Sequence, residues 1–263
     1  VDRLDDLLGK AILADLRRLQ RMPYRIDLAG GWLDQPFVST HFPGPVITVS
    51  IEPTLEFNER SGMASSTRRT ALKLWGSQLP SNDAEKLAWM LFCCDNPPGK
   101  PEISGSQDAI GIVYPGLAKA NYAGRYWPEQ IEHEQNEDRL RFVEQQIYLL
   151  PLGEREPDYA VLRNTRIDRA GAQALAEAAE CCWQAILQED ARAFGRAMTA
   201  SYEAQIAMVP NMVTATVAEM VETYRGQALG WKLSGAGGGG YLILAADRPI
   251  ENALRCVVRR ALV

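Results

Sequence analysis

A run of four glycines, Gly237–Gly240, constrains this chain more than any other feature. It stands between two short apolar segments, residues 231–233 and 241–245, which predict strands. Consecutive glycines are entropically costly to order, so such a run is favoured where the backbone must pass close to a ligand or to another backbone. A flexible hairpin turn is the alternative interpretation.

The same segment satisfies a bare GxGxxG pattern through Gly235, Gly237 and Gly240. A dinucleotide-binding loop of that pattern requires a helix after it, whereas YLILAA predicts a strand. We therefore reject that interpretation. No HRD or DFG motif accompanies the glycines, and the P-loop pattern GxxxxGK[ST] is missing from the sequence.

Composition narrows the functional classes. The chain has 263 residues, of which 46% are hydrophobic and 23% charged, as in ordinary globular proteins. The net charge of −5, without a basic stripe, argues against nucleic-acid binding. No apolar run of about 18 residues predicts a membrane span. Five cysteines in a pattern without CxxC are expected to be buried thiols, so we expect a cytoplasmic protein.

Strand and helix patterns mix along the whole chain, which predicts an α/β (α+β) fold. We expect an N-terminal unit over residues 1–150 and a C-terminal unit over 151–263, joined near GEREPD. Strands are predicted at 24–28, 46–51, 54–57, 145–150, 231–233 and 241–245. Helices are predicted at 2–20, from Ser65 or Ser66, at 82–95 with Asn82 as the cap, and at 168–188, 190–208, 211–226 and 249–262; residues 107–114 are either a helix or irregular.

The segment Ser61–Thr67 is small and polar and leads into a predicted helix. A phosphate chain needs close backbone approach, free N–H donors and a positive helix end, and this segment supplies all three. The hydroxyls of Ser65, Ser66 and Thr67 add donors or a magnesium ligand. An ordinary Ser/Thr-capped helix is the alternative.

Two further segments carry charged residues of chemical interest. Asp108, in GSQDAIGIVYPG, is a candidate to orient a substrate hydroxyl and accept its proton, or is a helix N-cap. Arg25 lies on an apolar strand, where a partly buried cation usually has an anionic partner. Asp34 follows the turn at Gly30–Gly31 and is a candidate ligand of sugar hydroxyls. A surface arginine and a turn aspartate are the alternatives.

The order of these segments resembles the GHMP kinases. The resemblance rests on a PxRIxLxGGxxD-like strand, a GxxSST loop entering a helix, a GxxD loop and KxxGAGGGG near the C-terminus, and it spans residues 23 to about 245. The Gly-Gly-x-x-Asp and Gly-Ser-Gln-Asp pieces are closest to the heptose-phosphate and fucose kinase branch. It implies a two-lobed fold, with an N-terminal ribosomal-protein-like lobe and a C-terminal ferredoxin-like lobe.

The resemblance also implies residue roles. Asp108 and Arg25 would be catalytic, and ATP and Mg²⁺ the cofactors. Phosphate binding would fall to Gly62, Met63, Ala64, Ser65, Ser66, Thr67, Gly237 and Gly238. The substrate would meet Gly31, Asp34, Tyr122 and Gly235. Magnesium would meet Ser66, and Asp95 stands about where the family has a magnesium-binding Glu. Met63 and Ala64 replace the family's usual Leu-Gly, and Arg68 and Arg69 are atypical there.

The expected activity is ATP-dependent phosphorylation of a hydroxyl, the anomeric one by the branch resemblance, on a sugar or sugar phosphate. The alternatives are a mevalonate-pathway kinase or decarboxylase of the same superfamily, and a non-catalytic ligand sensor on the same fold. Aromatic residues Tyr122, Tyr126 and Trp127 are candidates to pack on a sugar ring, or to pack in the core or in an interface. We expect a small-molecule substrate, no nucleic acid, no membrane, and a monomer or homodimer.

Overall fold

The computed structural model describes residues 21–261 except 55–56, 58–61, 82 and 154–158. The helix expected at 2–20 therefore lies outside the described residues. The strands are β1 (Tyr24–Ala29), β2 (Gly44–Ile51), β3 (Leu117–Tyr122), β4 (Gln130–Glu134), β5 (Ile147–Pro151), β6 (Gly230–Leu233) and β7 (Tyr241–Ala245). The helices are α2 (Pro36–Ser39), α3 (Ser65–Trp75), α4 (Ala84–Asp95), α5 (Gln107–Val113), α6 (Glu137–Gln146), α7 (Arg169–Leu187), α8 (Ala191–Met208), the 3-10 helix η1 (Pro210–Met212) and α9 (Ala215–Tyr224).

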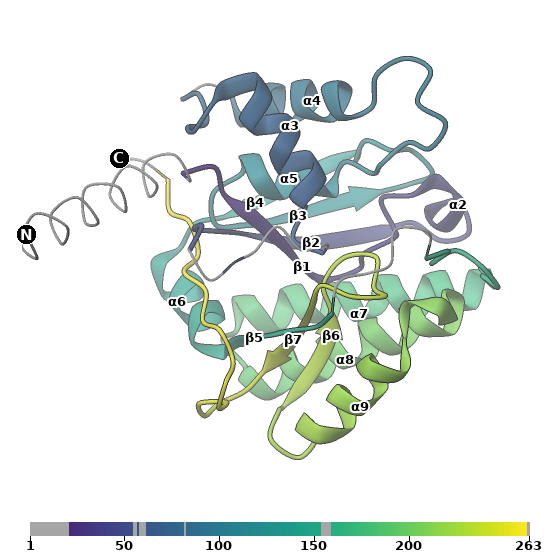
Figure 1. Cartoon of the computed structure of the whole chain (residues 1–263), viewed down its shortest axis with the longest axis vertical. Helices are drawn as coiled ribbons and strands as arrows, with labels where there is room; N and C mark the ends of the chain where they lie inside the picture. The colour runs from purple at the N-terminus through teal and green to yellow at the C-terminus, as the bar shows by residue number, and fades with distance from the viewer. Residues whose placement is uncertain (1–20, 55–56, 58–61, 82, 154–158, 262–263) are drawn as a thin grey trace, which may run out of the picture.

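The strands form two antiparallel sheets. The first has the order β1-β2-β3-β4 and the second the order β5-β7-β6. Figure 1 shows α3, α4 and α5 on one side of the four-stranded sheet and α7 and α8 on the other. Helix α8 contacts β1 as well as β6 and β7, so the two sheets share the layer that α7 and α8 form. The α/β expectation is confirmed.

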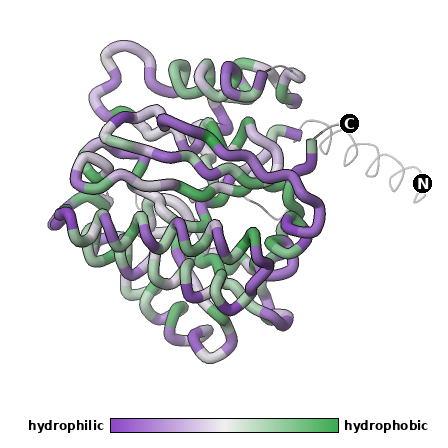
Figure 2. Tube along the Cα trace, turned by 180° about the vertical axis from the view of Figure 1, so that it is seen from behind, coloured by the Kyte–Doolittle hydropathy of each residue, from purple (hydrophilic) through white to green (hydrophobic). Residues whose placement is uncertain are grey.

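The long helices have one buried face each. Figure 2 shows hydrophilic and hydrophobic residues alternating along the helices that lie below the four-stranded sheet. In α7 the buried positions recur three and four residues apart, as in Leu175, Ala179, Cys182 and Ile186, which is the spacing of one helical face. Asp168, Asp190 and Thr214 cap α7, α8 and α9 by accepting a bond from the third residue on. None of the described helices is long and apolar enough to cross a membrane.

Three local expectations need correction or completion. Helix α4 is capped by Asp83, whose Oδ1 accepts from the amides of Glu85 and Lys86, and not by Asn82, which lies outside the described residues. Thr54 and Phe57 belong to no strand. The expected strand at 145–150 begins at residue 147, because α6 extends through Gln146.

The helix predicted at 249–262 is wrong. The described residues 249–261 contain no helix and pass along both sheets, with isolated bridges from Leu254 to Leu149 and from Val258 to Ile51. Burial alternates here: Cys256 and Val258 are buried while Val257 is 53% exposed. A period of two is the signature of extended chain. We call residues 254–260 the C-terminal strap.

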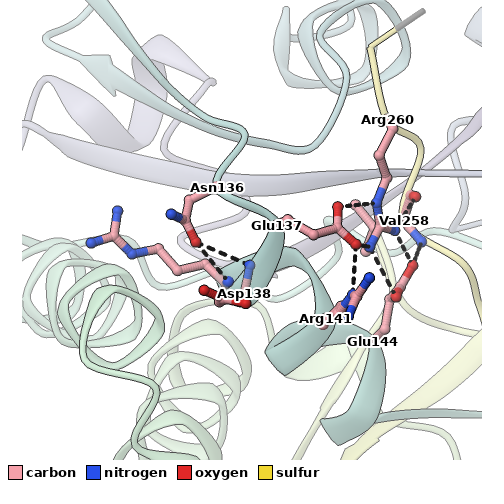
Figure 3. Close-up of polar contacts among 8 residues, drawn as sticks. Asn136, Glu137, Asp138, Arg141, Glu144, Val258 and Arg260 are labelled. Carbon is pink, nitrogen blue, oxygen red and sulfur yellow. Dashed lines mark hydrogen bonds and ion pairs between the residues drawn. The ribbon is translucent and has the colours of Figure 1, made fainter.

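Polar contacts fasten the end of the strap to α6. The Arg260 guanidinium pairs with Glu137, at 3.0 Å, and with Glu144, as Figure 3 shows. Arg141 donates to the same Glu137 carboxylate at 2.7 Å. Bonds from Arg260 and then from Arg141 lower the pKa of Glu137 to about 2. One residue earlier, Arg259 donates to the carbonyl oxygens that end α5.

Candidate active site

The alternation of β1 separates its core residues from its charged residues. Tyr24, Ile26 and Leu28 join the core beneath the sheet, so Arg25 and Asp27 face the other way, toward α5. Gly111 of α5 makes room for this arginine, because a Cβ there would overlap the Arg25 side chain. Burial lowers the pKa of the Arg25 guanidinium, against the opposing effect of Asp27.

Arg25 and Asp108 form an ion pair, as the resemblance implies. Asp108 lies in the first turn of α5, whose N-cap is Ser106, so the alternative of an N-cap aspartate is wrong. The other guanidinium nitrogen lies 3.4 Å from Asp27. Arg25 is 3% exposed at its side chain and Asp108 is 23% exposed, so the carboxylate is the member of the pair that reaches solvent.

Asp108 lines a cavity of about 1130 Å³. The cavity brings together segments that are far apart in the sequence: β1, the turn at Gly31–Asp34, the loop before α3, the loop before α5 and the glycine-rich segment. The sequence-predicted residues that line it are Arg25, Gly31, Asp34, Gly62, Ala64, Ser65, Ser66, Asp108, Gly235 and Gly237.

Asp34 lines this cavity beside α5. Its Oδ1 accepts a 2.9 Å bond from the Gln107 side chain. Gly105 packs against its other oxygen so closely that a Cβ would overlap it. Burial raises the pKa of Asp34 to about 6, although Arg25 and the Gln107 bond act in the opposite direction. A carboxylate held in this way can accept a substrate hydroxyl.

The loop before α3 has the properties of an anion site. Gly62 and Ala64 adopt positive φ angles of 98° and 56°. Ala64 caps α3 without a side-chain bond, and the first turn carries no acidic residue. Ala64 thus offers no side-chain acceptor to the N–H groups of that turn, and the turn lies beside the cavity through Ser65 and Ser66. A turn of this kind could hold the phosphates of a nucleotide, and the Ser66 hydroxyl could then offer a ligand to Mg²⁺.

The glycine-rich segment lies directly against this loop. A Cβ on Gly235 would lie 2.7 Å from the Gly62 Cα, and a Cβ on Gly62 would overlap Ser234. Such distances require glycine on both sides. Gly238 turns away and donates its N–H to the Met212 carbonyl at 2.9 Å. The expectation of a close backbone approach is thus met between two backbones.

Five residues that the resemblance assigns to the site do not line the cavity: Met63, Thr67, Asp95, Tyr122 and Gly238. Met63 is buried, and its carbonyl accepts from the Arg25 amide at 3.4 Å. Gly238 is the glycine bonded to Met212. Tyr122 is buried, with its hydroxyl 2.9 Å from Ser106, so its expected contact with substrate needs correction. Asp95 accepts from the hydroxyls of Thr67 and Thr70 at 2.8 and 2.9 Å. Asp95, at the end of α4, therefore links α4 to α3 and does not line the cavity.

The described residues contain no group of three or more His, Cys, Asp or Glu that could hold a metal ion. A magnesium ion would depend on nucleotide phosphates for most of its ligands, which is common for this ion. Trp127 is partly buried, packs against Trp89 and Phe92 at the edge of the core, and does not line the cavity. Tyr126 lines the cavity.

The sequence analysis missed a buried ion pair next to the cavity, which Asp27 lines and Lys232 does not. Lys232 of β6 is fully buried and donates to Asp27 at 2.7 Å and to the Leu233 carbonyl. The other Asp27 oxygen accepts from the Gly235 amide at 2.9 Å. Burial lowers the pKa of Lys232, against the effect of Asp27. A lysine inside a short apolar strand was the available signal, because an unpaired buried ammonium is costly.

The two atypical arginines of α3 have different surroundings. Arg68 is buried, donates to the Met22 carbonyl at 2.9 Å and lies over the Tyr24 ring at 4.1 Å. It thus joins the start of α3 to the chain entering β1. Arg69 is exposed and lines the cavity.

Comparison with known proteins gives one family match and a set of similar folds. Residues 183–263 match the family model of the GHMP kinase C-terminal domain. No curated protein matches the sequence. Among solved structures, mevalonate kinase of L. major in complex with R-mevalonate is 13% identical, with a TM-score of 0.59 over 92% of this chain and 95% of that one.

Two sugar kinases share the fold as well. A D-glycero-D-manno-heptose 1-phosphate kinase from Bacteriodes thetaiotaomicron is 11% identical, with a TM-score of 0.53 over 86% of this chain and 87% of that one. Lactococcus lactis galactokinase in complex with galactose is 16% identical, with a TM-score of 0.51 over 86% and 84%. At these identities the likeness concerns the fold.

The fold and the C-terminal match together confirm the resemblance to the GHMP superfamily. Each of the three neighbouring structures described above is that of a small-molecule kinase.

Proposed function

We propose that this protein is an ATP-dependent kinase that phosphorylates a hydroxyl, the anomeric one by the branch resemblance, of a sugar-like substrate. The observation that carries the proposal is the ion pair of Arg25 and Asp108, whose carboxylate lines the same cavity as the start of α3 and the glycine-rich segment. Phosphoryl transfer depends mainly on positioning and charge compensation, and this arrangement supplies both.

Each segment has a role in this proposal. Bound ATP supplies the phosphoryl group, and the loop from Gly62 to Ser66 holds its phosphates through backbone N–H groups. Asp34 accepts a bond from the substrate and orients it. Asp108 accepts the proton of the attacking hydroxyl, and the Arg25 guanidinium beside it compensates the negative charge that gathers there.

The test is ADP release with Mg-ATP against free sugars and sugar phosphates, with fucose, galactose, mannose and heptose 7-phosphate among them. We expect one acceptor to give turnover and Asp108→Asn to lower that turnover by roughly 10²- to 10⁴-fold. The matched control is Asp138→Asn, an exposed first-turn aspartate of α6 outside the cavity. Near-wild-type turnover of Asp108→Asn would refute its role.

If ADP is released only with a mevalonate-type acceptor, the proposed substrate class changes from a sugar to a hydroxy acid. ATP binding without turnover on any acceptor would count against the kinase assignment. If the wild-type protein does not bind ATP at all, the sensor alternative is favoured.

A further inference from the structure

Exposed apolar side chains gather at the mouth of the cavity. Among the described residues, seven large hydrophobic side chains are exposed, and three of them, Phe37, Ile103 and Leu162, line this cavity. Single exposed apolar residues are ordinary on protein surfaces. Three from three separate segments around one cavity indicate a surface that a ligand covers.

Trp32 extends this surface toward the catalytic end. It lines the cavity and has a φ of 83°, a conformation that a bulky side chain rarely adopts. Its ring lies 6.2 Å from the Phe37 ring, and its indole N–H points to the Met212 sulfur at 3.3 Å. Strained backbone of this kind concentrates at ligand sites, where the surrounding structure imposes it.

Tyr159, which also lines the cavity, is anchored to η1, the short helix that contacts Trp32. The Tyr159 hydroxyl donates to the Asn211 carbonyl at 2.7 Å, one residue before the Met212 that holds Trp32. The segment from Tyr159 to Leu162 and the segment of Trp32 are therefore both fixed to η1. We define the apolar wall as Trp32, Phe37, Ile103, Tyr159, Val161 and Leu162, all of which line the cavity.

The wall adjoins the acceptor carboxylate. Trp32 precedes Asp34 by two residues, and Phe37 follows it by three. Ile103 precedes Gly105 by two residues, and Gly105 packs directly on Asp34. A substrate whose hydroxyl bonds to Asp34 therefore places its neighbouring substituents against this wall.

Charges near the wall do not form an anion site. The Lys100 ammonium has three donors, and it contacts the Asp95 carbonyl, the Asn96 side chain and the Ser104 hydroxyl at 2.8 to 3.1 Å. Arg25 is engaged by Asp27 and Asp108. Arg163 follows Leu162, and the acidic Glu102 precedes Ile103, so the residues next to the wall carry charges of both signs.

We propose that the apolar wall is a specificity surface for the acceptor. The proposal rests on the kinase function above and names its substrate class: a polyol with a deoxy or alkyl substituent beside the hydroxyl that Asp34 binds. A hydroxyl or phosphate in that position loses water without gaining a partner. One unpaired buried hydroxyl weakens binding by roughly 5- to 100-fold.

The test measures binding without turnover, by isothermal titration of the wild-type chain. The probes are three sugar series matched at one carbon, in which carbon 6 carries a hydroxyl, no oxygen, or a phosphate: galactose, D-fucose and galactose 6-phosphate, with the corresponding mannose and glucose series. In at least one series we expect the 6-deoxy sugar to bind at least about fivefold more tightly than its parent and the phosphate to bind most weakly.

Two variants tie that preference to the wall. Leu162→Ser and Phe37→Ser should each reduce the preference for the deoxy sugar toward equal affinity, because each places a hydroxyl on the wall. Both residues are exposed, so both variants should melt near the wild-type temperature. The matched control is Val257→Ser, an exposed apolar residue outside the cavity, which should keep the full preference.

Equal binding within every series, tighter binding of the phosphates, or no binding of any sugar would each overturn the inference. A deoxy preference that survives Leu162→Ser and Phe37→Ser would overturn it too. Failure of the proposed function has a different outcome: wild-type protein that binds the deoxy sugar with the wall-dependent preference and yet releases no ADP with Mg-ATP.

Discussion

Asp34 is 2% exposed, and burial raises the pKa of its carboxyl to about 6 from an ordinary value of 3.8. Below about pH 4 the group is protonated in both the folded and the unfolded chain. Between about pH 4 and 6 the unfolded chain loses this proton first, so the stability of the fold falls as the pH rises through that window. Above pH 6 the folded protein carries the whole cost of a buried charge.

Asp34→Asn should therefore stabilise the fold at pH 8. A shift of about two pKa units corresponds to about 3 kcal/mol, and the gain should vanish below about pH 4. The measurement is denaturant unfolding of both proteins at pH 4, 6 and 8. A stability difference that stays constant across this range would contradict the prediction. Binding of the acceptor should weaken in the same variant, because the amide is a poorer hydroxyl acceptor.

The residues that sequence analysis identified are those whose type is unusual for their place. An arginine on an apolar strand and an aspartate after Gly-Gly both line the cavity. Asp27 escaped notice because it alternates with apolar neighbours as an outward-facing strand residue would. Its value as a partner depends on Lys232, which lies 205 residues away, and no local pattern reports such a distant contact.

At the scale of elements, adding a side chain to a glycine can cost stability in two ways: through backbone strain and through a clash with a neighbouring segment. Gly235 and Gly76 have similar φ angles of 65° and 69°, but a Cβ on Gly235 would press on Gly62 while a Cβ on Gly76 meets nothing within 4 Å. The second substitution therefore reports backbone strain alone, and the first adds the contact with the phosphate loop.

Gly76→Ala should cost about 1–3 kcal/mol of stability, because φ 69° with ψ −136° is a conformation strongly restricted to glycine, and should leave ATP affinity unchanged. Gly235→Ala should cost more and should also weaken ATP binding, because the loop before α3 must move. Thermal unfolding and titration of ATP into both variants provide the comparison. Equal effects of the two substitutions on both quantities would show that the contact between the segments is unimportant.

The C-terminal strap offers a second matched pair. Val258→Ala removes methyl groups from a fully buried side chain and should destabilise the fold by about 1–3 kcal/mol, whereas Val257→Ala alters a side chain that is 53% exposed and should be nearly neutral. Chemical denaturation of the two variants measures this difference. Similar losses in both would be inconsistent with an extended strap.

Periodicity explains which elements could be predicted. The Ala-rich sequence of α7 has the period of a helix, and β7 is a short, continuous apolar run; both were predicted. Strands β3 and β4 were not, because LAKANY and QIEHE mix residues of low strand propensity with charges. The strap was mistaken for a helix because the residues that it pairs with, Leu149 and Ile51, are remote in sequence.

At the scale of the whole molecule, the proposed division at residue 150 does not divide the core. One buried cluster holds Ile26 and Val49 from the first half together with Trp183 and Ile243 from the second. Strand β5 belongs to the first half by sequence and pairs with β7. The strap bonds to both sheets as well.

We therefore expect the chain to unfold in a single cooperative transition, because neither half can keep its apolar surface buried without the other. Far-ultraviolet circular dichroism and tryptophan fluorescence should give coincident urea curves, and residues 1–150 expressed alone should lack the thermal transition of the full chain. Two separated transitions would instead support independent lobes.

The contact between Gly62 and Gly235 also limits how this protein can change over time. Most contacts in a core can drift, since an enlargement on one side is tolerated after a reduction on the other. Here both partners already have the smallest side chain there is, so no second substitution can restore the fit. The two positions should therefore stay fixed in descendants of this sequence and should show no correlated variation, although they lie against each other.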